Sequence, residues 1–136
     1  MQLIYMILYM LTTTEYYKKG LTKIGITSNI MDIYYNFEKI SDNWTFLAIY
    51  NITGTNETMK AVYSNLDHPY DHLQHHLDHN WYQDVQPMSI ETFLEKNHIS
   101  FIQIKELIDY TKKQIIYQNI DSIHDFNHHF NLKYEL

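Results

Sequence analysis

The chain contains neither cysteine nor arginine, and its 136 residues include only three glycines and two prolines. Without cysteine there is no disulfide framework, no thiolate nucleophile and no thiolate metal ligand. The scarcity of glycine and proline indicates compact elements joined by few long flexible linkers. The longest apolar run, Leu3 to Leu11, is too short for a helix that crosses a bilayer. Because no basic segment precedes that run, we expect no signal peptide and an intracellular protein without a membrane partner.

Charge and composition narrow the class of protein further. The chain carries sixteen carboxylates against ten lysines, a net charge of −6 with its nine histidines neutral. This acidic balance disfavours a general nucleic-acid binder, which usually presents a stripe of Lys and Arg. Apolar residues make up 45% of the chain and aromatic residues 15%, which is enough to bury a core. The length favours a single domain.

The codon usage of the source genome also explains part of the composition. Isoleucine, tyrosine, asparagine and lysine together occupy 52 of the 136 positions, and all four have A/T-rich codons. The missing arginine points the same way. The composition therefore suggests an A/T-rich genome, such as that of a phage or a large DNA virus.

Hydrophobic patterning predicts a small α+β domain that begins β-β-α-β-α and continues with helices. Strands are predicted over 2–12, 21–27 and 44–52, with a polar connection over 13–20 and a short extended piece over 81–85. Helices are predicted after Asn29, after Asn56, over 90–96 with Ser89 as N-cap, and over 102–117. The last twenty residues are predicted to be a docked or frayed tail.

Two neighbouring strands carry a pair of motifs. The first strand ends in Tyr9-Met10-Leu11-Thr12-Thr13-Thr14-Glu15-Tyr16-Tyr17, and the second is Lys23-Ile24-Gly25-Ile26-Thr27-Ser28-Asn29; Asn80-Trp81-Tyr82 follows later. Together they resemble the GIY-YIG nuclease superfamily, and more closely its DNA-binding branch in phages and large DNA viruses, whose second motif is KIG-x-T. The resemblance covers roughly residues 4–85. It implies a three-stranded antiparallel sheet flanked by helices over 1–86, with 87–136 as a C-terminal helical extension packed on it or mediating interactions.

The resemblance implies phosphodiester hydrolysis with a divalent metal, a tyrosine and an arginine. Tyr9 matches the first-motif tyrosine and Gly25 the second-motif glycine, but Ile33 occupies the arginine position and Lys60 the metal-binding glutamate position. Glu57, three residues before Lys60, is the remaining carboxylate on that face. We therefore expect a disabled site and no cofactor. Tyr9 and Glu57 are catalytic candidates, with Mg²⁺ or Mn²⁺, only if the chain is a divergent, weak endonuclease.

Three lysines near the motifs are the candidate nucleic-acid contacts. Lys18, Lys19 and Lys23 are the best remaining partners for phosphate. The alternative interpretation is that they form a solvated surface on an acidic domain. Any nucleic-acid binding through three contacts would be weak and sensitive to salt.

Histidines form the most unusual local pattern. His68, His72, His75 and His79 recur with a spacing that places them on one face of a helix. We expect a polar, pH-sensitive surface without a metal, and the alternative is a bound transition metal. The later run His128-His129-Phe130 is attributed to composition.

These observations predict a catalytically inactive, GIY-YIG-like binding module of viral origin. Its partner is expected to be a protein, a second copy of the chain or a nucleic acid. The abundance of tyrosine suits protein interfaces, and the negative charge favours a protein partner or self-association. Two alternatives stay open: a weak metal-dependent endonuclease, and a structural component of a viral particle.

Overall fold

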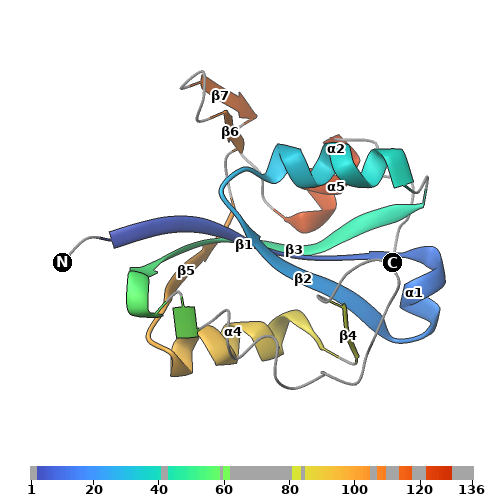
Figure 1. The fold of residues 1–136 in the computed structure, drawn as a ribbon. Coiled ribbons are helices and arrows are strands. Elements are labelled where there is room, and N and C mark those ends of the chain that lie inside the picture. Colours follow the sequence, from blue (N-terminus) through green and yellow to red (C-terminus); the bar gives the residue numbers. More distant parts are fainter. Residues whose placement is uncertain are drawn as a thin grey trace.

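A computed structural model describes residues 3–40, 43–58, 60–61, 81–83, 85–104, 107–109, 114–117 and 122–129. It confirms an α+β fold, in which a five-stranded antiparallel sheet of order β4-β2-β1-β3-β5 lies between helices (Figure 1). The strands are β1 (Leu3–Thr13), β2 (Leu21–Thr27), β3 (Trp44–Thr55), β4 (Trp81–Gln83) and β5 (Ser100–Gln103), and a separate hairpin consists of β6 (Leu107–Asp109) and β7 (Gln114–Tyr117). The helices are α1 (Thr14–Lys18), α2 (Ile30–Ile40), α4 (Pro87–Lys96) and α5 (Ile123–His129).

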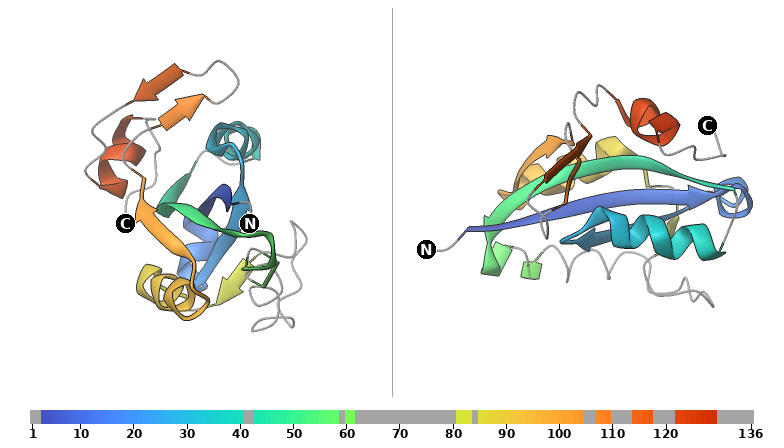
Figure 2. Two further views of the ribbon diagram at one scale, coloured as in Figure 1. Left: turned by 90° about the vertical axis from the view of Figure 1, so that its left-hand side faces the viewer. Right: turned by 90° about the horizontal axis from the view of Figure 1, so that it is seen from above.

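The central strand β1 separates two hydrophobic cores. Because successive side chains of a strand point to opposite faces, Ile7, Tyr9 and Leu11 pack under α2 and α5, whereas Leu8 and Met10 pack against α4. Figure 2 shows α2 and α5 on one side of the sheet and α4 on the other. Every β1 residue from Ile7 to Thr13 is buried, which explains why this strand is almost uniformly apolar in sequence.

The connection between β1 and β2 contains a short helix that sequence reasoning treated only as a polar link. Thr13 caps α1, because its Oγ1 accepts a hydrogen bond from the backbone N–H of Tyr16 at 3.2 Å. Gly20 has a φ of 74°, a backbone conformation that glycine adopts without steric penalty. The glycine therefore allows the chain to leave α1 and enter β2.

The sheet is wider than predicted. Besides the three expected strands it contains β4, which pairs with β2, and β5, which pairs with the outer edge of β3. The helix predicted over 102–117 is wrong, because the described residues there form β5, β6 and β7. The apolar spacing fitted a helix, but the open edge of β3 offers backbone partners to β5, and β6 and β7 pair with each other. The extension over 87–136 is accordingly not only helical.

Helix α4 begins at Pro87, with Gln86 as N-cap, rather than at Ile90 after Ser89. Proline fits the first position of a helix because its missing N–H would have no helical partner there. Ile90 and Leu94 bury against the sheet. The Tyr50 hydroxyl on β3 donates a hydrogen bond to the Glu91 carboxylate at 2.9 Å, which ties α4 to the sheet.

Helix α5 is docked on β3. A docked tail was one of the two alternatives predicted for this part of the chain. Phe126 is 1% exposed and its ring packs edge-on against Phe46, with centroids 5.4 Å apart. The Asn127 amide holds the backbone of Phe46 at both groups: its Oδ1 accepts from the N–H at 3.0 Å and its Nδ2 donates to the C=O at 2.8 Å. Strand β5 pairs with β3 from Tyr50 to Thr53. At Phe46, the Asn127 amide forms the hydrogen bonds that a neighbouring strand would otherwise provide.

Some predictions lie outside the described residues. This applies to His68, His72, His75 and His79, and to most of the helix predicted after Asn56, of which positions 56–58 and 60–61 are helical. None of the helices in the described part of the chain has the length and apolar character that a membrane span requires.

Candidate functional site

Tyr9 and Gly25 face each other on neighbouring strands. They are paired in the β1–β2 register, and the Tyr9 ring lies directly over the glycine. A Cβ atom on Gly25 would stand 2.6 Å from Tyr9 Cζ and 2.9 Å from Cε1, with the hydroxyl oxygen nearer still. Only a residue without a side chain leaves room for the ring here. Tyr9 is 4% exposed and packs edge-on against Phe46, so its phenol belongs to the core.

The three candidate lysines do not gather on one surface. Lys23 is 5% exposed, and its Nζ lies 5.9 Å from the centroid of the Phe37 ring. Lys18 is the last residue of α1 and Lys19 is its C-cap, and both are exposed. The Lys19 ammonium is 3.5 Å from the Glu15 carboxylate, which offsets its charge. A phosphate at α1 would therefore not reach the buried Lys23.

Ile33, Glu57 and Lys60, the other positions singled out by the predicted resemblance, do not converge with Tyr9. Ile33 is half-buried and packs against the core under α2. Glu57 and Lys60 are exposed after the end of β3. Thr55 pairs with Leu3, which is six residues from Tyr9 and so about 20 Å along β1. Tyr9 and Glu57 therefore share no cavity, and the structure does not assemble a hydrolytic site from the candidate residues.

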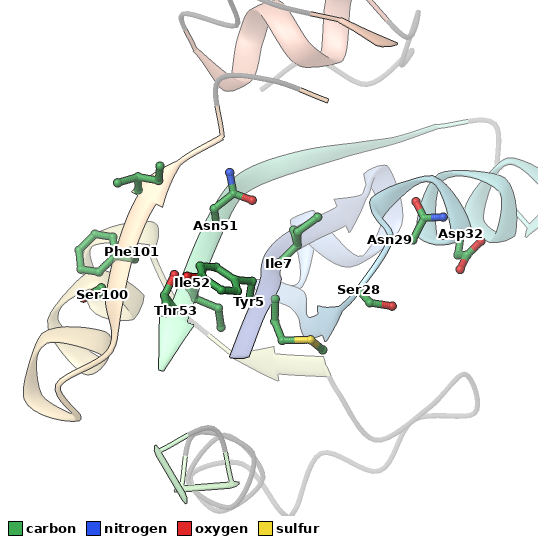
Figure 3. A pocket seen from close by; sticks show the side chains of 12 residues that line it. Tyr5, Ile7, Ser28, Asn29, Asp32, Asn51, Ile52, Thr53, Ser100 and Phe101 are labelled. Carbon is green, nitrogen blue, oxygen red and sulfur yellow. The ribbon is translucent and has the colours of Figure 1, made fainter. Parts of the chain in front are cut away.

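A hollow of about 850 Å³ opens on the face of the sheet that carries Tyr9, next to the start of α2. Figure 3 shows its side chains, which come from β1, β3, β5 and the start of α2. Two rows of paired residues cross the sheet and form the floor. One row is Tyr5, Thr53 and Ser100, and the other is Ile7, Asn51 and Ile102.

The wall of the hollow at α2 carries negative charge. Asn29 caps this helix, since its Oδ1 accepts from the N–H of Met31 at 3.0 Å. The Asn29 N–H in turn donates to Thr27 Oγ1 at 3.1 Å. Asp32 in the first turn is exposed and is the one charged side chain among the lining residues. Because the cap occupies the Met31 amide and Asp32 repels anions, this helix start does not suit a phosphate.

The rim of the hollow is apolar. Among the lining residues, Tyr5 is 70% exposed and Ile102 is 62% exposed. Leu3, which does not line the hollow, is also exposed at the start of β1. A cluster of exposed apolar side chains beside polar groups is typical of an interaction site. Sequence analysis missed this site because the run from Leu3 to Leu11 is apolar throughout. It contains no alternation that would distinguish its exposed end from its buried end.

The described residues contain no group of three or more His, Asp or Glu side chains that could hold a metal ion. Comparison with protein-family models, with curated proteins and with solved structures finds no match to this chain. The assignment of a function therefore rests on the residues and their arrangement.

Proposed function

We propose that this chain is a catalytically inactive, GIY-YIG-like domain that acts by binding an extended segment of another protein in the hollow at Tyr5. The proposal depends on a difference between the two ends of one face of the sheet. Tyr9 and Ile33, which correspond to the family's tyrosine and arginine, pack in the hydrophobic core, whereas the neighbouring end of the same face is open and includes exposed side chains.

Burial and separation support the loss of hydrolysis. A nuclease needs a metal-held carboxylate, a water-activating group and a cation that converge on one phosphate. Tyr9 lies under α2 and α5, Ile33 replaces the cation, and Glu57 is about 20 Å away along β1. These residues cannot reach one phosphate together.

Charge supports a protein partner over a nucleic acid. The chain has a net charge of −6, and the lining of the hollow includes one carboxylate and no lysine or histidine. Nucleic-acid affinity depends mainly on cations that neutralise phosphates. Lys18 and Lys19 at the end of α1 are exposed, but Lys19 forms an ion pair with Glu15. These two lysines can therefore neutralise few phosphates.

The geometry favours a partner segment in extended conformation. In the sheet order β5 is an edge strand, and a strand edge can hydrogen-bond to a peptide backbone. A peptide placed along β5 would direct alternate side chains over Ile102 and Ser100. An apolar side chain of such a peptide fits against Ile102, and the Asp32 carboxylate on the opposite wall of the hollow attracts a basic residue of the segment.

Selection from a random peptide display library against the full chain tests this proposal. We expect enriched peptides that combine a basic residue with an apolar one, whose binding is lost in Tyr5→Ser and is weakened in Asp32→Asn. The matched control is Tyr35→Ser, since Tyr35 is an exposed tyrosine on α2 that does not line the hollow. If no peptide distinguishes the chain from its Tyr5→Ser variant, the proposal is wrong. Concentration-dependent dimerisation that Tyr5→Ser abolishes would identify a second copy as the occupant.

A nuclease assay tests the inactivity separately. Plasmid DNA incubated with the protein and Mg²⁺ or Mn²⁺ is expected to stay intact. Nicking that disappears in both Tyr9→Phe and Glu57→Gln would support the endonuclease alternative. A structural role in a viral particle stays a prediction that neither assay addresses.

A further inference from the structure

Helix α5 carries two histidines that face each other across one helical turn. His124 and His128 are both exposed, and their rings are stacked with centroids 6.4 Å apart and planes inclined by 19°. Residues four apart lie on the same side of a helix. Since this side faces solvent, an ion can approach both rings.

The lone pairs of an imidazole lie in the plane of its ring, so the stacked rings must turn before one nitrogen of each can bind the same ion. Both side chains are exposed and lie one helical turn apart, so they have the freedom to turn in this way. A helical pair of histidines four residues apart is a recurring zinc-binding arrangement, and water can complete the coordination shell of the ion. Metal ions bind the neutral form of imidazole, so metal binding competes with protonation and is favoured at higher pH. Imidazole nitrogen suits Zn²⁺, Ni²⁺ and Cu²⁺, whereas Mg²⁺ and Ca²⁺ prefer oxygen ligands.

We propose that His124 and His128 form a two-histidine site for a transition-metal dication, and that the bound ion stabilises the docked form of α5. The helix has seven residues, a length at which an isolated helix is unstable in water. Its attachment depends on the buried Phe126 ring and on the Asn127 amide that holds Phe46. Both residues lie between the two histidines in sequence, so a metal that joins His124 to His128 fixes the turn that presents them to β3.

Metal binding at α5 would also affect the face of the sheet that carries Tyr9. Phe126 packs on Phe46, and Phe46 packs on Tyr9. A more firmly docked α5 therefore protects this part of the core from solvent. The site is independent of the hollow, because α5 contributes none of its lining residues.

Isothermal titration of the full chain with NiCl₂ or ZnCl₂ at pH 7.5 tests the proposal by comparing the unmodified chain with its variants, because the chain has seven other histidines. We expect His124→Gln and His128→Gln each to lose one equivalent of bound metal relative to the unmodified chain. The matched control is His98→Asn, because His98 is also exposed and asparagine tolerates its φ of 57°. That variant is expected to keep the full stoichiometry. Equal stoichiometry and affinity in the unmodified chain and in the double variant would overturn the proposal.

Hydrogen exchange provides the second readout. Metal is expected to slow exchange at the amides of Phe46 and Phe126 in the unmodified chain and in His98→Asn, but not in His128→Gln. Because both histidines are exposed, the substitutions should leave the fold intact. Metal binding without slower exchange at these two amides would refute the stabilisation of α5.

Discussion

Replacement of Gly25 by alanine tests the contact that defines the two motifs. Glycine in a strand interior is usually less stable than alanine by about 0.5–1 kcal/mol, so an unobstructed site would gain stability on substitution. Here the new methyl group would meet the Tyr9 ring, with Cζ at 2.6 Å. The ring cannot turn away easily, because it is 4% exposed and lies against Phe46. Overpacking of this kind costs about 1–3 kcal/mol, so we expect a net destabilisation of about 1–2 kcal/mol.

A double-mutant cycle in urea separates this contact from other effects of the substitution. Tyr9→Ala alone should cost about 3–5 kcal/mol, as large-to-small changes of buried aromatic residues do. In that background Gly25→Ala should become neutral or stabilising, which gives a coupling energy of about 2 kcal/mol. Tyr9→Phe is the matched control, because it removes the hydroxyl and keeps Cζ and Cε1 in place. With Tyr9→Phe the alanine should therefore still destabilise. An alanine that stabilises the unmodified chain, or one with the same effect in all three backgrounds, would refute the reasoning.

Three further predictions concern other parts of the fold. Asn127→Ala should lower the free energy of unfolding by about 2 kcal/mol, because it leaves the N–H and C=O of Phe46 without their partner amide; unchanged urea denaturation would contradict this. Burial, the hydrogen bond to Glu91 and the charge of that carboxylate raise the pKa of Tyr50 above its ordinary value of 10.0. Folding thus favours the neutral phenol, and the associated stability is present below about pH 10 and is lost at higher pH. Tyr50→Phe should reduce this alkaline loss in melts between pH 8 and pH 11, and an identical pH profile would exclude the effect. Replacing Lys18 and Lys19 by serine should abolish any DNA binding, which should be weak and salt-sensitive; binding in fluorescence anisotropy that survives this change at physiological salt would place the interface elsewhere.

The sequence by itself determined the elements whose local signals agree with their environment. The apolar residues of 2–12, 21–27 and 44–52 marked the three central strands, since these strands are buried and their composition reflects it. Helix α2 was predictable because Asn29 caps it and its apolar residues recur with helical spacing. Tyr9 and Gly25 were singled out from sequence as the residues that match the two motifs, and the structure places them in contact.

Tertiary structure decided the elements and sites that depend on distant partners. The segment 102–117 has apolar residues that suit a helix or a strand, and the free edge of β3 selects the strand at 100–103. Lys23 was expected at the surface because of its charge, but its strand position places it among Phe37 and Trp81. The hollow at Tyr5 depends on where α2 begins above the sheet, and the α5 site depends on how Asn127 docks that helix. None of these has a local signal, because each arises from residues that are far apart in the sequence.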